Sequence, residues 1–294
     1  MRMQLETIKQ EYEFDCLNRG HSPNTMRAYR TALRQFMEFA QASQVEYADQ
    51  LTTSVIRAFA SQSMNQLSPA GAHARLRVLR SFLRWSTDEG YFEKNPMQRV
   101  PLPRLKQKLL DAVSAQDMKR LLLAAQNSAT PLKYQALLAV LYDTGLRVSE
   151  LRNLELRDLL PTQCLMVREG KGGKDRIVPI SRPTLKLIHR YMRDERPDSA
   201  LPHLFLVDDC SPYSNISLYK LLERLCRRAG TKRYSPHAFR RGFAVNYIRN
   251  GGDQFTLMRV LGHTTLTMTN RYAALNTSDV QDVHRRVSPM AALQ

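Results

Sequence analysis

The sequence predicts a mainly α-helical protein with two parts: a helical N-terminal domain and a mixed α+β domain that holds a small β-hairpin or sheet. Two long amphipathic helical patterns occupy the first hundred residues, a Pro- and Lys-rich segment follows, and one strand–turn–strand pattern interrupts a helical remainder. The chain has 294 residues and is 43% hydrophobic, which is enough apolar material for a packed core and excludes a disordered chain.

The first helical pattern begins at Ser22-Pro23, a typical helix start with proline in the first turn. Apolar residues then recur every three or four positions and predict one buried face: Tyr29, Leu33, Phe36 and Ala40. Another face carries arginines at the same spacing: Arg27, Arg30 and Arg34.

The segment 68–85 repeats this design, again with a Ser-Pro start. Its apolar face consists of Leu76, Leu79 and Leu83, and its basic face consists of Arg77, Arg80 and Arg84. One basic helix face is usually only a solvated surface, but two in a small helical domain favour contact with DNA.

Helix-breaking residues place the domain boundary. Asn95-Pro96 is a turn signal, and the prolines at 101 and 103 exclude a regular helix. Helical patterns resume at Ser114, a predicted N-cap. We therefore expect a helical domain over 1–95, a linker over 96–110 and a second domain over 111–294.

The charge of the chain suits a polyanionic partner. Lys and Arg number 44 against 27 Asp and Glu, a formal net charge of +17. Neutralising phosphates releases counterions and drives sequence-independent binding to nucleic acid. Solubility and an acidic protein partner are the alternatives that net charge alone does not exclude.

Other classes of protein are disfavoured. The longest purely apolar run, 136–142, is too short to span a bilayer, and the N-terminus lacks the apolar core of a signal peptide, so we expect a cytoplasmic protein without membrane contact. The four cysteines are scattered and no His cluster accompanies them, so we expect no metal site, no disulfide and no cofactor: Cys16, Cys164, Cys210 and Cys226.

Several short segments of the second domain carry groups suited to phosphate. Arg147 follows a glycine turn and precedes a helix, whose N-terminus favours anions. Strands over 164–169 and 176–180 flank a glycine-rich turn with Lys171 and Lys174. His237 and Arg240 are three residues apart on one helix face.

Each of these segments also has an ordinary structural interpretation. Arg147 could pair with Glu150, and the lysine turn lacks the spacing of a P-loop. His263 follows Gly262 and could cap a helix C-terminus, and a lone tyrosine such as Tyr272 is usually packing. The set taken together is more specific than any one member.

In order and spacing these segments resemble the tyrosine recombinases, the phage-integrase family that includes the Xer-type resolvases. The resemblance covers about residues 110–275, and the N-terminal part is similar to the family's core-binding domain. The length of the chain resembles that of the two-domain Xer-type proteins. One departure is Arg241, which stands where many relatives have histidine.

The resemblance implies a site-specific recombinase that cleaves and rejoins DNA strands through a 3′-phosphotyrosyl intermediate, for integration, excision or resolution, without metal or ATP. The catalytic residues that it implies are Arg147, Lys171, His237, Arg240, His263 and the nucleophile Tyr272. The alternatives are a type IB-like nicking-closing enzyme and a DNA-binding regulator that has lost catalysis.

The implied partner is double-stranded DNA, bound by a tetrameric synapse of one protein or by a hetero-assembly with a related recombinase. A helix start at 276–279 precedes valines spaced by three and four, and in this family such a C-terminal helix docks on a neighbouring protomer. Candidate DNA contacts are the two basic faces and two further residues: Arg27, Arg30, Arg34, Arg77, Arg80, Arg84, Lys174 and Arg241.

Overall fold

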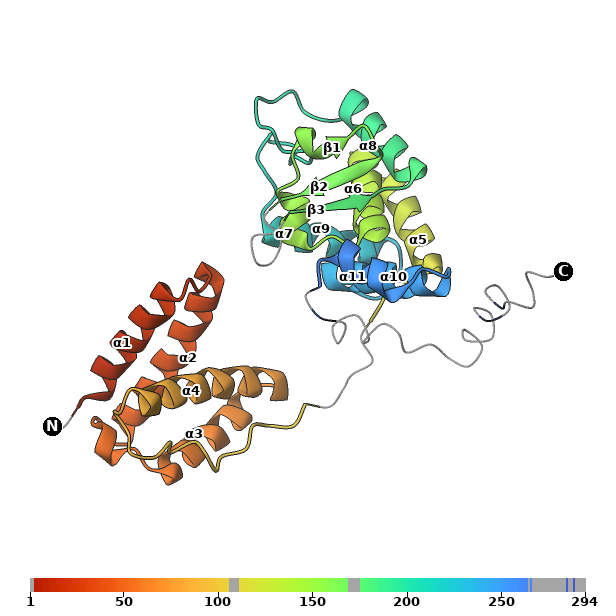
Figure 1. The fold of residues 1–294 in the computed structure, drawn as a ribbon. Coiled ribbons are helices and arrows are strands. Elements are labelled where there is room, and N and C mark those ends of the chain that lie inside the picture. Colours follow the sequence, from red (N-terminus) through yellow and green to blue (C-terminus); the bar gives the residue numbers. More distant parts are fainter. Residues whose placement is uncertain are drawn as a thin grey trace. The chain divides into compact units, whose positions relative to one another are not determined.

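The structure is a computed structural model that describes residues 3–105, 111–168 and 175–263, with residues 265, 284 and 288. The chain divides into two compact units, Met1–Lys108 and Leu109–Gln294, and each is described by itself (Figure 1). Neither unit contains, within the described ranges, a helix long and apolar enough to cross a membrane.

The first unit is helical, as predicted. Its elements are α1 (Leu5–Asn18), α2 (Pro23–Ala42), a 3-10 turn (Ala48–Gln50), α3 (Thr53–Gln66) and α4 (Pro69–Asp88). The Ser22 and Ser68 side chains accept hydrogen bonds from the backbone N–H groups of Thr25 and Gly71, so both predicted Ser-Pro helix starts are N-caps.

The apolar faces of these helices form one core. Leu33, Phe36 and Leu76 are fully buried, and the Phe36 and Phe59 rings meet edge to face at 5.2 Å between centroids. The periodicity therefore identified the inward side of α2 and α4, and it leaves five of the six arginines on their basic sides exposed: Arg27, Arg30, Arg34, Arg77 and Arg84.

The segment expected to link the domains begins as part of this core. Met97 and Val100 are buried against the first unit, and the Arg80 guanidinium donates to the Val100 carbonyl at 2.6 Å. The prolines prevent a helix, but they do not prevent packing. Residues 96–102 therefore belong to the first unit, which moves the expected boundary, and 106–110 lie outside the described residues.

The second unit combines helices with a small sheet. Its elements are α5 (Ala115–Gln126), α6 (Pro131–Thr144), α7 (Val148–Arg152), a 3-10 turn (Leu156–Asp158), β1 (Leu159–Leu160), β2 (Cys164–Val167), β3 (Arg176–Pro179), α8 (Arg182–Asp194), α9 (Asn215–Arg228), α10 (Pro236–Arg249) and α11 (Gln254–Leu261). The predicted N-cap Ser114 begins α5 and accepts from Asp117 N–H at 3.0 Å.

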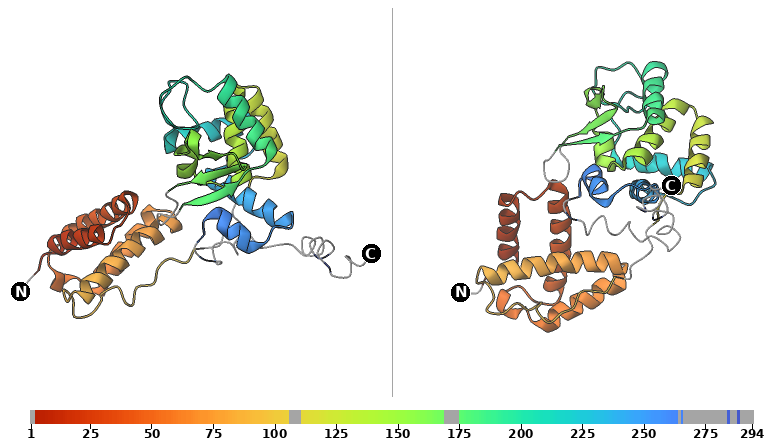
Figure 2. Two further views of the ribbon diagram at one scale, coloured as in Figure 1. Left: turned by 45° about the horizontal axis from the view of Figure 1, so that its top comes forward. Right: turned by 45° about the vertical axis from the view of Figure 1, so that its right-hand side comes forward.

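The sheet has the order β1-β2-β3 and is antiparallel throughout its described strands. The predicted strands become β2 and β3, with Leu165 opposite Val178 and Val167 opposite Arg176. The short β1 was not predicted. Leu165, Val167 and Val178 are buried in the same core as α6, and α11 packs against β3 (Figure 2).

Candidate active site

Two left-handed glycine turns bring distant parts of the second unit together. Gly145 ends α6 with φ 61°, and Gly262 ends α11 with φ 64°. A Cβ on Gly145 would lie 2.6 Å from the Phe243 ring and 2.8 Å from the Leu261 side chain. Only glycine fits this turn without displacing its neighbours, so the close approach of α6, α10 and α11 depends on it.

Arg147 stands at the N-cap of α7, two residues beyond the first turn, as the sequence predicted. Its side chain is 23% exposed. Its guanidinium donates to Glu150 Oε1 at 2.7 Å and to the Gly262 carbonyl at 3.5 Å. Arg147 therefore reaches from the start of α7 to the turn that ends α11.

Arg240 approaches the same two turns from α10. Its guanidinium donates to the Gly145 carbonyl at 2.7 Å and to the Leu261 carbonyl at 2.6 Å. The residue is 4% exposed, which is rare for arginine. Carbonyl partners fix the orientation of a guanidinium without neutralising its charge.

Glu150 balances part of this charge. Its side chain is 5% exposed, and it accepts from the Arg147 backbone N–H at 2.7 Å and from both terminal nitrogens of Arg176 at 2.9 and 2.8 Å. Burial opposes ionisation, but the hydrogen bonds and charges of Arg176 and Arg147 outweigh it and lower the pKa of Glu150 to about 2. Two guanidiniums, those of Arg147 and Arg176, thus share one carboxylate, so the cluster keeps a positive excess.

The two histidines stay neutral near pH 7. Burial, followed by the charges of Arg240, Arg147 and Arg176, lowers the pKa of His263 to about 4. His237 faces solvent on the first turn of α10, yet desolvation of its ring and the charges of Arg240, Arg241 and Arg147 lower its pKa as well. A neutral imidazole retains one N–H donor and one proton acceptor.

The structure thus brings Arg147, His237, Arg240 and His263 into one electrostatic cluster, with Glu150 beside them. The predicted residues Lys171, Lys174 and Tyr272 lie outside the described residues, as does the predicted C-terminal helix from 276 apart from His284 and Ser288. Among the described residues, no group of three or more His, Cys, Asp or Glu is placed to hold a metal ion.

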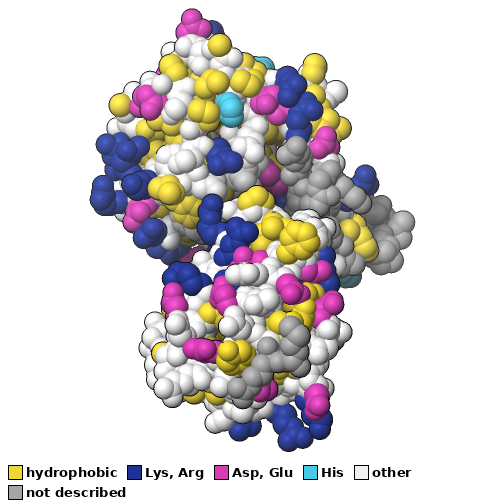
Figure 3. Space-filling model, turned by 90° about the vertical axis from the view of Figure 1, so that its left-hand side faces the viewer, with side chains coloured by type: hydrophobic (Ala, Val, Ile, Leu, Met, Phe, Trp, Pro, Cys, Tyr) yellow, Lys and Arg dark blue, Asp and Glu magenta, His cyan; other side chains and the backbone are white. Residues whose placement is uncertain are grey.

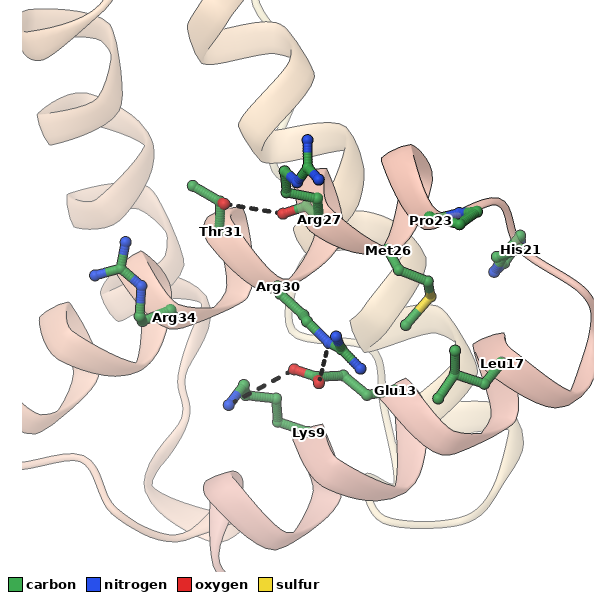
Figure 4. Close-up of a pocket in the computed structure, with 10 residues that line it drawn as sticks. All are labelled: Lys9, Glu13, Leu17, His21, Pro23, Met26, Arg27, Arg30, Thr31 and Arg34. Carbon is green, nitrogen blue, oxygen red and sulfur yellow. Dashed lines mark hydrogen bonds and ion pairs between the residues drawn. The ribbon is translucent and has the colours of Figure 1, made fainter. Parts of the chain in front are cut away.

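The arginines of α2 line a groove of about 620 Å³ between α1 and α2 (Figure 4). Arg30 points to Glu13 and bonds it at 3.0 Å, and Lys9 lies 3.6 Å from the same carboxylate. Arg27 and Arg34 point away from Glu13, and all three arginines are exposed. This surface can offer its cations to a large anion.

The arginines of α4 differ from one another. Arg77 and Arg84 are exposed, whereas Arg80 is half-buried and bonded to the Val100 carbonyl. The structure therefore gives Arg80 a role in holding residues 96–102, which the periodicity did not reveal.

Arg241, the candidate DNA contact on α10 of the second unit, donates its Nε to the Asp111 carbonyl at 2.6 Å. It lies beside a small pocket of about 190 Å³.

Sequence reasoning missed Arg176, which completes the Glu150 pair and lies on β3 directly beyond the hairpin turn. The available signal was a lone arginine at the start of an apolar strand, adjacent to a turn already assigned to phosphate. On the face shown in Figure 3, Lys and Arg side chains form several groups on the second unit, whereas basic and acidic side chains stand next to one another on the first.

Exposed arginines on the helical unit, and fixed guanidiniums near two neutral histidines in the second unit, are features that suit a phosphate-containing partner. The comparisons with known families agree. The model described as "Phage integrase family" matches residues 112–279, and the model described as "Phage integrase, N-terminal SAM-like domain" matches residues 11–90. The chain belongs to the phage integrase family, which confirms the predicted enzyme class, a tyrosine-type site-specific recombinase.

Relatives match along nearly the whole chain. A tyrosine recombinase XerD of Staphylococcus saprophyticus is 29% identical over 300 residues, which cover 98% of this chain and 100% of the relative. A XerD of Listeria monocytogenes serotype 4b is 28% identical over 296 residues, covering 97% and 99%.

Solved structures share the fold. The crystal structure of XerA recombinase is 25% identical with a TM-score of 0.55 and covers 96% of this chain and 99% of its own. A lambda integrase dimer bound to a COC′ core site has a TM-score of 0.77 at 19% identity, covering 92% and 77%. The Tn1549 transposon integrase in complex with transposon right end DNA has a TM-score of 0.76 at 20% identity, covering 96% and 99%. These likenesses confirm the mainly helical fold with its small sheet.

Proposed function

We propose that the chain cuts and rejoins DNA by transesterification at a single phosphodiester. The Tyr272 phenolic oxygen attacks phosphorus, the bond from phosphorus to the 5′ oxygen breaks, and a 3′-phosphotyrosyl link and a 5′-hydroxyl result. The reverse step, with a 5′-hydroxyl of the same or a different strand, restores the backbone. The bond energy is conserved in the covalent intermediate, so rejoining needs no ATP. The observation that carries the proposal is the convergence of Arg147, Arg240 and His263 at the two glycine turns.

The guanidiniums supply the main catalytic effect. Charge accumulates on the non-bridging phosphate oxygens in the transition state, and Arg147 and Arg240 are already oriented by Glu150 and by main-chain carbonyls. Donors that need no rearrangement stabilise such a state most effectively. Neutral His263 adds an N–H donor to the same oxygens.

Two proton transfers accompany the attack. His237 is neutral and exposed, so its ring nitrogen can accept the proton of the Tyr272 phenol. By family resemblance Lys171 donates a proton to the departing 5′ oxygen, with Lys174 as the competing residue.

We place the protein in the cytoplasm, on double-stranded DNA. The exposed arginines of α2 and α4 provide backbone contacts for the first unit, and Lys174 and Arg241 provide them for the second. A lambda integrase tetramer bound to a Holliday junction shares the fold, with a TM-score of 0.76 at 18% identity. The corresponding assembly here is a tetramer, of one protein or with a related recombinase, joined by residues 276–294. Deletion of these residues should preserve site binding and weaken synapsis.

The decisive experiment uses suicide DNA substrates, which trap the covalent adduct. The variant Tyr272→Phe should still shift DNA in a gel and should form no adduct. An adduct with the Phe variant would contradict the assignment of the nucleophile.

Substitution of Lys171 should slow cleavage of ordinary DNA. A 5′-thiolate leaving group, which needs no proton, should restore the rate. Absence of this rescue would move the acid role to another residue.

Strand exchange separates the recombinase from the alternatives. A recombinase joins strands of two differently labelled duplexes, whereas a nicking-closing enzyme only relaxes supercoils and an inactive regulator does neither. Family membership favours the first outcome.

A further inference from the structure

Arg176 lies beside the candidate active site, and the proposed chemistry does not use it. It is the first residue of β3, and its side chain is 11% exposed. Its two terminal nitrogens bind both oxygens of Glu150 at 2.9 and 2.8 Å, and its Nε donates to the Val260 carbonyl at 2.8 Å. Every nitrogen of the guanidinium therefore donates to the protein.

The carboxylate that Arg176 binds is the one that orients Arg147. Glu150 accepts from the Arg147 guanidinium and from the Arg147 backbone N–H, both at 2.7 Å. A bidentate arginine fixes the plane of a carboxylate as well as its position. The orientation of Arg147 thus depends on Arg176 through Glu150.

Arg176 also reaches the turn that carries His263. Val260 lies near the end of α11, and a Cβ on Gly262 would stand 3.2–3.3 Å from the Arg176 side chain. The side chain therefore fills the space directly beneath this turn. One residue connects β3, α7 and the end of α11.

We propose that Arg176 is a positioning residue for DNA cleavage: by clamping Glu150 and the Val260 carbonyl, it holds Arg147 and the His263 turn in the geometry that grips the scissile phosphate. The inference rests on the proposed function. Arg176 also begins the strand that follows the hairpin turn, so the stem of that hairpin is fixed to the same clamp.

Loss of the clamp has an electrostatic consequence. The charged groups that act on Glu150 are Arg147 from the start of its own helix and Arg176 from β3, and the titratable group in the turn after α11 is the neutral His263. Without Arg176, burial of the carboxylate is opposed by Arg147 alone, and Glu150 takes up a proton at a higher pH. A protonated Glu150 no longer anchors Arg147.

The test compares Arg176→Met and Arg176→Lys with the unaltered chain, using suicide substrates at saturating DNA across a range of pH. For the Met variant we expect DNA binding within about twofold and cleavage slower by about 100-fold, the effect of a misplacement near 1 Å. Its rate should also fall on acidification where the unaltered chain stays constant. The Lys variant keeps a charge beside Glu150, so it should restore the pH profile and only part of the rate.

Arg168→Met is the matched control. Arg168 follows β2 on the other side of the same hairpin and bonds the buried Asp158 at 2.7 Å. Its loss removes an arginine from a buried carboxylate away from the clamp, so the pH profile of cleavage should not change.

Unaltered cleavage and an unaltered pH profile in the Met variant would overturn the proposal. If the Met variant melts before assay, the Lys variant decides: a wild-type rate would overturn the proposal, and a reduced rate at an unchanged melting temperature would support it. Failure of the unaltered chain to form any adduct would contradict the proposed function instead, which keeps the two failures distinct.

Discussion

In the N-terminal unit Arg34 and Arg84 each pair with a carboxylate one helical turn later and remain exposed, whereas in the second unit Arg240 is buried and bonded to two main-chain carbonyls. Exposed pairs of the first kind contribute about 0.2–1 kcal/mol, so their arginines exchange partners easily. The second kind is fixed before any ligand arrives. The same residue type thus suits the two tasks proposed for it: adaptable attachment along DNA, and rigid binding of one phosphate.

The largest expected effect is on the rate of DNA cleavage and comes from the buried arginine, Arg240. Arg240→Gln should slow DNA cleavage by about 10²–10³-fold, because it removes one preorganised donor from the transition state. Binding of the DNA site should change little, since the exposed arginines remain. Single-turnover cleavage at saturating DNA and a gel shift measure the two quantities.

The neighbouring Arg241→Gln is the control for this prediction. Among the described residues, Arg241 is more accessible than Arg240 and is held through its Nε, so its loss should weaken binding and spare cleavage at saturating DNA. An Arg240 variant that lost binding but kept its cleavage rate would remove the distinction between the two kinds of arginine.

An intermediate effect is expected from acid. The pKa values of Glu150 and His263, about 2 and about 4, both lie below their ordinary values of 4.5 and 6.5. Between the folded and ordinary values the unfolded chain binds more protons, so stability falls as pH drops from 6.5 toward 4 through His263, and below 4.5 through Glu150. His263→Gln should flatten the first part of this decline.

The single tryptophan allows the two units to be observed separately. Trp85 lies in the core of the N-terminal unit, so its fluorescence reports that unit, while hydrogen exchange of α10 and α11 reports the second. The effect of His263→Gln should appear in hydrogen exchange and not in Trp85 fluorescence. An equal shift in both signals would show that the acid response is not local to the site.

The smallest expected effect distinguishes two arginines of α4. Arg77→Gln should weaken DNA binding modestly and reduce the slope of log K against log salt by about 0.9, the value for one phosphate contact. Arg80→Gln should leave the slope unchanged and lower thermal stability, because Arg80 bonds Val100 instead. Equal salt slopes for the two variants would place Arg80 on the DNA-binding surface after all.

Local signals explain what the sequence could predict. The serine N-caps before α2, α4 and α5 act on backbone groups three residues away, and the core faces follow from spacing within one helix. The position of Arg147 at a helix start after a glycine turn was equally local. Its family resemblance then placed it with Arg240 and His263.

What could not be predicted depends on contacts between distant segments. The role proposed for Arg176 depends on its hydrogen bonds to Glu150 and to the Val260 carbonyl, and no residue near position 176 in the sequence indicates those partners. In the same way, the prolines after residue 100 indicate an irregular backbone, yet only the folded unit shows Met97 and Val100 packed in its core. Proline content thus predicts whether a segment can form a regular helix, whereas the burial of that segment depends on tertiary packing.

The use of main-chain oxygens to hold Arg240 has a consequence for protein engineering. A carbonyl cannot be deleted by substitution, so libraries that vary the side chains around this region to retarget the enzyme retain the acceptors of Gly145 and Leu261. Gly145 itself must be left out of such libraries, because any Cβ there collides with Phe243. The turn at Gly145 is therefore intolerant of substitution, whereas the carbonyl acceptors persist whichever side chains surround them.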